Sequence, residues 1–199
     1  MKKITQFLMI CAFGFGVATT ALAAGVTLTL APVTTGIINS IGGTTDYTLS
    51  ISGLHASPDI TNSPALGGYN VVLNFDSNIV LFGSVVYGSA VNDFATTDSS
   101  VSGQVTLSNL SFSDAATLQA TQAASFTMAT VTFQGAGPGT SSIAIDPTST
   151  LSDEFGNSLA VVNTNNTTIQ SVPEPSGYAL ALFGFLLVLA NARRRMLIS

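Results

Sequence analysis

The 199-residue chain has little of the chemistry on which many binding and catalytic sites depend, with one cysteine, one histidine and no tryptophan. The cysteine, Cys11, lies in an apolar run near the N-terminus that we expect to be removed. The rest of the chain therefore has no disulfide, no thiolate metal site and no cysteine nucleophile. Its core must be stabilised by burial of apolar side chains alone.

Lysine and arginine are absent from residues 24–172. A surface without cations cannot neutralise phosphates, which argues against binding to nucleic acid. Solubility then depends on Ser, Thr, Asn and carboxylates, a composition typical of extracellular β-proteins whose negative charge opposes self-association. The five basic residues of the chain are Lys2, Lys3, Arg193, Arg194 and Arg195.

Enzymatic chemistry is not indicated. His55 lies beside Pro58 and Asp59 in a predicted loop, and no Gly-x-Ser-x-Gly nucleophile motif accompanies it. Asp153 and Glu154 are adjacent, so on a strand they would face opposite ways, unlike the paired carboxylates of a glycosidase. We therefore predict no catalytic residue and a protein that is not an enzyme.

Metal ligands are equally sparse, and we predict no metal site. Zinc would need more than one histidine. Calcium is the one cofactor left open, because loop carboxylates could supply oxygen ligands, although none has EF-hand spacing. The candidate sets are Asp93 with Asp98, and Asp146 with Asp153 and Glu154.

The N-terminus has the order of a secretory signal peptide. Met1-Lys2-Lys3 is positively charged, the run from Phe7 to Val17 is uncharged, and Ala21 and Ala23 supply small residues for signal peptidase. The alternative, a retained membrane helix, is disfavoured because about 15 apolar residues fall short of the ~20 that cross a bilayer. We predict a signal peptide over residues 1–23, cleaved after Ala23.

Residues 24–170 read as short strands separated by turns. Alternation of apolar and polar residues predicts half-buried antiparallel strands. About nine such runs without a long helix favour an all-β, two-sheet sandwich, with a barrel as the alternative. The predicted strands are 26–30, 47–51, 69–75, 79–87, 101–110, 126–133, 143–145, 159–162 and 167–170.

Three local features accompany the strands. Asp76-Ser77-Asn78 predicts a turn, because Asx side chains bond their own backbone. Gly83 within a strand predicts a bulge. The Ala-rich run 114–124 opens with a capping-type Asp114 and predicts a short helix that contributes little core.

The order of these segments resembles the cohesin domain, a jelly-roll β-sandwich. The resemblance rests on residues 66–76 with 79–81, on 128–133, on 139–143 and on 151–157, and spans most of residues 26–170. It implies a protein-interaction module. The Ala-rich run 114–124 departs from the compact pattern of that family, which argues against carrying over its dockerin-type binding face.

The C-terminus, 171–199, combines a Pro-Glu-Pro motif, an apolar run and an arginine cluster. Pro173 and Pro175 keep the chain before the run extended. Residues 176–192 carry no charge and predict a helix of about 25 Å, barely matching a hydrocarbon core of ~30 Å. The arginines favour a cytoplasmic C-terminal end.

This tail resembles the PEP-CTERM sorting signal of Gram-negative bacteria that produce exopolysaccharide. The resemblance implies recognition by exosortase, a membrane transpeptidase that is thought to cut near Pro-Glu-Pro and pass the protein to the surface or matrix. The alternative is a plain C-terminal membrane anchor. The residues of the motif are Pro173, Glu174, Pro175, Arg193, Arg194 and Arg195.

Together these features predict an exported protein that is held transiently in the inner membrane and then reaches the cell surface or extracellular matrix. There it would act as a structural or adhesive module that binds another surface protein. The alternative is a carbohydrate-binding module for exopolysaccharide, with Tyr47, Tyr69 and Tyr87 as stacking residues, although the alternation places Tyr47 and Tyr69 on core faces.

Overall fold

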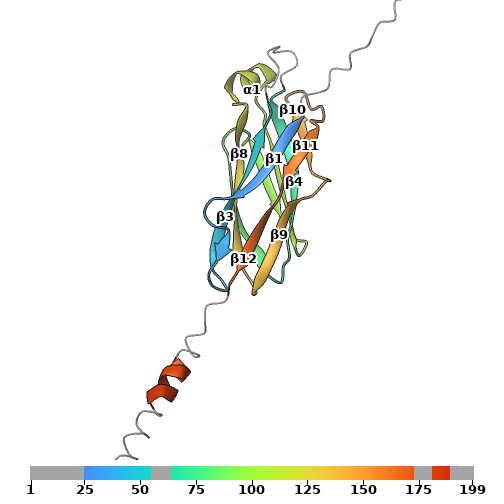
Figure 1. Ribbon diagram of the computed structural model, residues 1–199. Coiled ribbons are helices and arrows are strands. Elements are labelled where there is room, and N and C mark those ends of the chain that lie inside the picture. Colours follow the sequence, from blue (N-terminus) through green and yellow to red (C-terminus); the bar gives the residue numbers. More distant parts are fainter. Residues whose placement is uncertain (1–24, 55–63, 173–180, 189–199) are drawn as a thin grey trace, which may run out of the picture.

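The computed structural model describes residues 25–54, 64–172 and 181–188, and its strands between residues 26 and 171 form a β-sandwich of two facing sheets (Figure 1). Twelve strands lie in the described residues, five in one sheet and seven in the other. The strands are β1 (Val26–Pro32), β2 (Ile37–Ile38), β3 (Thr44–Ser52), β4 (Leu66–Asn74), β5 (Val80–Tyr87), β6 (Phe94–Asp98), β7 (Gln104–Leu110), β8 (Ser125–Gly135), β9 (Gly139–Ile145), β10 (Thr150–Asp153), β11 (Val161–Asn165) and β12 (Thr167–Ser171).

The five-stranded sheet has the order β11-β1-β3-β8-β5, and the seven-stranded sheet has the order β2-β12-β9-β4-β7-β6, with β10 also paired to β4. Most neighbours are antiparallel, as predicted. Two pairs are parallel instead, β1 with β11 and β2 with β12. In both pairs a late strand returns beside an early one, a pairing that no local pattern can reveal.

The alternation predicted from the sequence holds in the central strands. In β3, Tyr47, Leu49 and Ile51 are buried, while the residues between them face outward. The ring of Phe133 packs edge-on against Tyr47, at 5.9 Å between ring centres, and against Phe75, at 5.3 Å. Such aromatic contacts add to the apolar area buried between the sheets.

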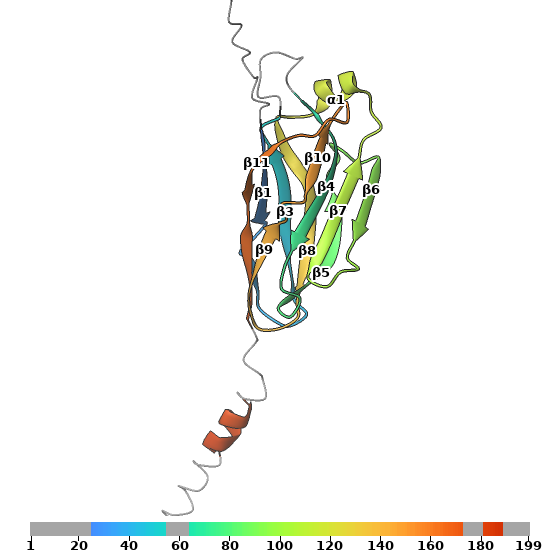
Figure 2. The same cartoon turned by 90° about the vertical axis from the view of Figure 1, so that its right-hand side faces the viewer.

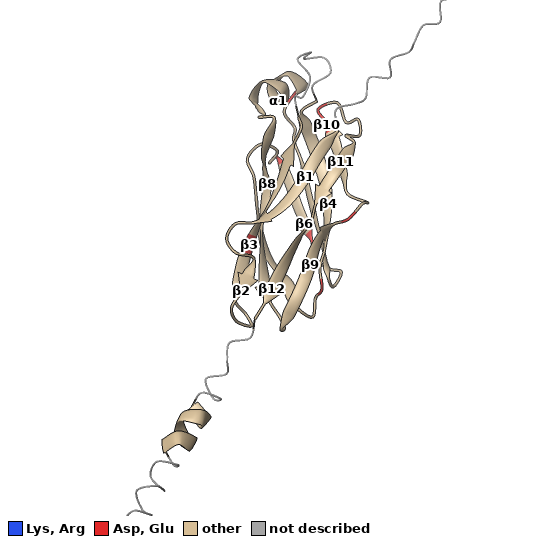
Figure 3. Cartoon of the chain, viewed as in Figure 1, with Lys and Arg blue, Asp and Glu red and all other residues tan. Residues whose placement is uncertain are grey.

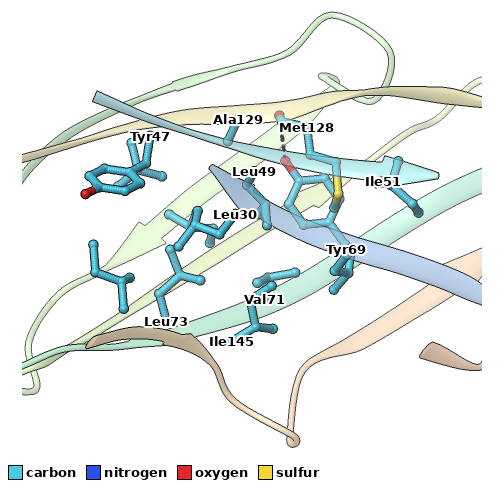
Figure 4. Packing of buried hydrophobic residues seen from close by; sticks show 14 of the residues in the cluster. Leu30, Tyr47, Leu49, Ile51, Tyr69, Val71, Leu73, Met128, Ala129 and Ile145 are labelled. Atoms are coloured by element: carbon cyan, nitrogen blue, oxygen red, sulfur yellow. Dashed lines mark hydrogen bonds between the residues drawn. The ribbon is translucent and has the colours of Figure 1, made fainter. Parts of the chain in front are cut away.

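Tyrosine hydroxyls connect the two sheets at three places. Tyr47 of β3 donates to the carbonyl oxygen of Thr168 in β12 at 2.9 Å. Tyr69 of β4 donates in the opposite direction, to Met128 of β8 at 3.2 Å (Figure 4). Tyr87 of β5 donates to Thr96 of β6. Each hydroxyl thus finds a partner, which a buried tyrosine requires.

The predicted strand count is too low by three, because β2, β6 and β10 were not recognised. Two of them are too short to show a period, with two residues in β2 and four in β10. All five residues of β6 are exposed, so this strand has no apolar alternation to detect. The prediction also began β7 too early, since Val101 lies in an exposed turn before the strand.

The three local predictions are confirmed. Asp76 Oδ1 accepts the main-chain N–H of Asn78 at 2.9 Å, which closes the predicted turn. The register between β5 and β8 shifts between Phe82 and Ser84, which places a bulge at Gly83. The helix α1 (Ala115–Thr121) is capped by Asp114, whose side chain accepts the Thr117 N–H.

The helix α1 is fixed to the sandwich by Gln122, its C-terminal cap. The Gln122 side chain accepts from Leu66 N and donates to Leu66 O, both at 2.7 Å, and also donates to Ala90 O at 3.1 Å. On the same side of the helix, Gln119 donates to Glu154. The helix therefore holds the start of β4 in place although it buries only Leu118.

Residues 181–188 are helical and fall inside the membrane helix predicted over 176–192. The positions on either side of them lie outside the described residues. Within the part of the chain that the structure describes, no helix has the length and apolarity for a membrane crossing.

Candidate functional site

A groove of about 470 Å³ is lined by residues of β10, β4, β7 and β6. These four strands lie side by side in the seven-stranded sheet (Figure 2). We call this groove the outer groove. Strand register aligns two rows of side chains across it. One row is Ser152, Gly68, Leu110 and Phe94, and the other is Thr150, Asn70, Ser108 and Thr96.

These two rows face outward because the residues between them along each strand face the core. Tyr69, Leu151 and Asn109 are buried. Gly68 makes the floor of the groove: a Cβ there would lie 2.9 Å from Leu110 Cδ1 and 3.2 Å from Ser152 Oγ. The missing side chain therefore lets Leu110 lean across β4 within the groove.

One rim of the groove is formed by Phe94, and a second exposed phenylalanine, Phe112, lies in the segment that follows β7. Phe94 is 58% exposed and Phe112 is 71% exposed. Asp93 fixes this rim, because its Oδ2 accepts the Phe112 N–H at 2.6 Å and the Ser111 hydroxyl at 2.9 Å. The chain that leaves β7 is thus bonded to the residue that precedes β6.

The opposite rim is the turn that follows β10. Asp153 Oδ1 accepts the main-chain N–H groups of Phe155 at 2.9 Å and Asn157 at 2.7 Å, and Phe155 is 70% exposed. The turn lies close to β4 because Gly67 has no side chain; a Cβ there would collide with the Asp153 carbonyl oxygen. Exposed aromatic side chains around one groove are typical of a protein-interaction surface.

The surface around the groove is acidic. The described residues include no lysine or arginine, and Figure 3 shows their carboxylates scattered over the sandwich. The Phe112 N–H and the Ser111 hydroxyl hold the pKa of Asp93 below its usual value. The Ser100 N–H lowers the pKa of Asp98 in the same way. Both ends of β6 therefore carry negative charge at neutral pH.

The carboxylates proposed as calcium ligands do not converge. Asp93 and Asp98 stand at opposite ends of the extended strand β6, about 16 Å apart along it. Asp146 instead accepts bonds from Asn74 and Thr148, and β10 separates it from Glu154, which accepts Ala65 N. No group of three His, Cys, Asp or Glu side chains able to hold a metal occurs within 25–54, 64–172 and 181–188.

The residues predicted to direct export and sorting lie outside the described ranges. They are Ala21, Ala23, Pro173, Glu174, Pro175, Arg193, Arg194 and Arg195, and His55 lies outside as well. The tyrosines proposed for sugar stacking are placed by the structure. Tyr47 and Tyr69 are buried in the core, as the alternation predicted, so neither can stack on a sugar.

Burial alters the chemistry of these tyrosines. It raises the pKa of Tyr47 to about 12, and it raises the pKa of Tyr69 further above its ordinary value. Their hydroxyls are structural donors between the sheets. The exposed aromatics that the sequence did not single out are phenylalanines, and Gly67-Gly68 is the one local signal that could have pointed to the groove.

Comparison with known proteins identifies the fold only through solved structures. No family model matches the chain, and no curated protein matches it. CaCohA2 from Clostridium acetobutylicum is 16% identical with a TM-score of 0.57, covering 75% of this chain and 92% of its own. A non-cellulosomal cohesin from the archaeon Archaeoglobus fulgidus is 15% identical with a TM-score of 0.54, covering 78% and 97%.

A third similar structure is the sixth cohesin of scaffoldin B from Acetivibrio cellulolyticus, solved in complex with a Cel5 dockerin mutant. It is 15% identical with a TM-score of 0.56, over 75% of this chain and 99% of that one. The protein is therefore an all-β sandwich, and the sandwich is cohesin-like. This part of the sequence prediction is confirmed.

Proposed function

We propose that this chain is an exported, non-enzymatic interaction module that docks another protein in the outer groove. The observation that carries the proposal is the set of exposed apolar side chains around Gly68, on a surface otherwise made of hydroxyls, amides and carboxylates. Cohesin-like folds support it, since the similar structures include a cohesin solved with its dockerin. The partner here is a surface or matrix protein.

A substitution that fills the groove tests this docking. Ser108→Trp places a large side chain between Asn70 and Thr96, on an outward position of β7. Ser50→Trp is the matched control, an outward serine of β3 on the opposite face of the sandwich. After cross-linking in the native host, S108W should lose the partner protein and S50W should keep it. Equal recovery with both variants would contradict docking in the groove.

Carbohydrate binding is the second candidate function, and the tyrosines no longer support it. Tyr47 and Tyr69 are buried, and Tyr87 uses its hydroxyl between the sheets. A glycan array with the full-length chain separates the two functions. If the parent chain retains a specific sugar and S108W does not, the ligand of the groove would be a polysaccharide and not a protein.

Delivery by the C-terminal tail is a separate part of the proposal. The chain is exported through the signal peptide 1–23, and exosortase processes it at the Pro-Glu-Pro motif for the surface or matrix of a Gram-negative bacterium. The end of the sandwich supports this, because Val172 N donates to Ile38 O at 2.8 Å and the next residue is a proline without an N–H. The last described residue of the sandwich is therefore next to the motif in the sequence.

Mass spectrometry of the protein on the surface of its native host tests the sorting. Loss of everything beyond about residue 175 is expected. An intact C-terminus recovered in the inner membrane would leave a plain anchor.

A further inference from the structure

The sandwich has four sheet-edge strands in the described residues, and three of them are unsuited to pairing with another chain. β2 has two residues. The register of β5 breaks between Phe82 and Ser84, and that of β11 breaks at Val162. Short or bulged edges resist the addition of a further strand. The free side of β10 is covered by its own chain, since Leu159 N donates to Leu151 O.

The fourth edge, β6, is regular. Its five residues pair with β7 in an unbroken register from Phe94↔Leu110 to Asp98↔Thr106. It contains no proline and no glycine, and every residue is exposed. Such an edge is a template for strand addition.

The hydrogen-bond pattern shows which groups of β6 are free. Ser111 N donates to Gly67 O at 2.9 Å, so the odd-numbered residues of β7 bond to β4 and the even-numbered ones face β6. Even residues of β6 lie opposite even residues of β7. Ala95 and Thr97 therefore turn their N–H and C=O groups to the open side.

Tyr87 holds this edge from inside the sandwich. Its hydroxyl donates to the Thr96 carbonyl, which faces β7, and lies 2.8 Å from Thr97 Oγ1. The main-chain groups of Ala95 and Thr97 are left untouched. An edge that is already ordered loses less conformational entropy when a partner strand binds.

The charges at β6 indicate what the added strand carries. Asp93 precedes the strand and Asp98 ends it, and no described residue supplies a cation. A segment with basic residues at both ends would meet both carboxylates. A second copy of β6, paired antiparallel about Thr96, would bring only further acids.

We infer that β6 is a strand-addition site for an extended segment of the partner protein, uncharged in its centre and basic at both ends. The segment pairs with Ala95 and Thr97 and continues the seven-stranded sheet beside Phe94. This inference rests on the proposed docking function. It adds that a segment of the partner protein binds at the edge of the groove as a β-strand.

The test uses the full-length chain and a synthetic peptide, Lys-Thr-Val-Thr-Val-Thr-Lys, with a matched peptide carrying Glu at both ends. The Lys peptide should bind about tenfold more tightly at low salt, with the difference shrinking as salt rises. On binding, the amide protons of Ala95 and Thr97 should exchange at least about tenfold more slowly. Equal binding of the two peptides, or unchanged exchange, would overturn the inference.

Variants separate this inference from the proposed function. Ala95→Pro removes only an N–H group that faces the open edge, which an edge strand tolerates. Thr97→Pro removes the same kind of N–H group and also the hydroxyl that lies 2.8 Å from the Tyr87 hydroxyl. Both should abolish peptide binding and capture of the native partner. If S108W loses the native partner while both proline variants keep it, the result would support docking in the groove and would contradict strand addition at β6. If the amide protons of Ala95 and Thr97 exchange more slowly merely because the protein concentration is raised, the strand added to β6 would come from a second copy of this chain. That result would also overturn the inference.

Discussion

Gln122 is the residue whose removal should weaken the sandwich most for the smallest change in apolar burial. It is 9% exposed, and its amide satisfies both main-chain groups of Leu66 and the carbonyl of Ala90. In Gln122→Ala, the N–H and C=O of Leu66 lose their partner. Leaving a buried main-chain group unsatisfied costs about 1–3 kcal/mol, so the two groups together cost about 2–6 kcal/mol.

That loss is a large part of the 5–15 kcal/mol by which domains are ordinarily stable. Urea unfolding followed by circular dichroism measures it as a lower midpoint at unchanged slope. Gln119→Ala is the matched control on the same helix. It removes one bond to the half-exposed Glu154 and should cost clearly less.

Gln122→Glu gives a sharper test. The ionised side chain keeps an acceptor for Leu66 N but has no donor for Leu66 O, so its folded-state pKa should be raised above the ordinary value of about 4.3. The deficit should be full at pH 7 and should shrink as pH falls below about 4.3, relative to the parent chain, because the protonated side chain can donate to Leu66 O. Part of it should remain, because one O–H cannot also serve Ala90 O. A loss below about 1 kcal/mol in Q122A, or a deficit in Q122E that does not change with pH, would refute the role assigned to Gln122.

Three further predictions concern buried hydroxyls and hydrogen-bonded carboxylates at the surface. Tyr47→Phe should lower the free energy of unfolding by about 1 kcal/mol, because it removes the hydroxyl that donates to Thr168 O in the facing sheet. Tyr69→Phe should cost less, because Met128 O still accepts the Gly88 N–H at 2.8 Å; urea midpoints equal to that of the parent for Tyr47→Phe would contradict this. Thr45 Oγ1 is buried without a partner among the described residues, so Thr45→Val should raise stability by about 1 kcal/mol, and a lower melting temperature would count against this. The pKa values of Asp93, Asp98, Asp114 and Asp146 are lowered by hydrogen bonds, so their contribution to stability is present above the ordinary value of about 3.9 and is lost as pH falls through their lower folded values. Urea midpoints measured from pH 6 to pH 2 should therefore fall, and Asp146→Asn should flatten the slope; a midpoint that rises towards low pH would contradict it.

The sequence predicts the sandwich well where one face of a strand is buried. Tyr47, Leu49 and Ile51 share one face of β3, and a period of two follows directly from the pleat of the strand. The helix α1 was likewise predictable, because Asp114 is a strong capping residue. Both signals are local in the sequence, so they can be recognised without knowledge of the tertiary structure.

The outer groove could not be predicted in this way, because it depends on register between strands distant in sequence. Ser152, Gly68 and Leu110 become neighbours only when β10, β4 and β7 pair. The edge strand β6 escaped notice because all its side chains are exposed. Alternation of apolar and polar residues indicates which face of a strand is buried. It carries no information about a strand that binds a partner through the main-chain groups of its free edge.

The most direct test of the account is photo-cross-linking in the native host. A photoreactive amino acid replaces Phe112, which is exposed and whose N–H is bonded to Asp93 next to the groove residue Phe94. In a separate chain it replaces Ser50, on the outer face of β3. We predict a covalent adduct with one protein partner at Phe112 that is absent at Ser50 and is lost in the S108W background. The same adduct at Ser50, or persistence of the Phe112 adduct in S108W, would contradict docking in the outer groove.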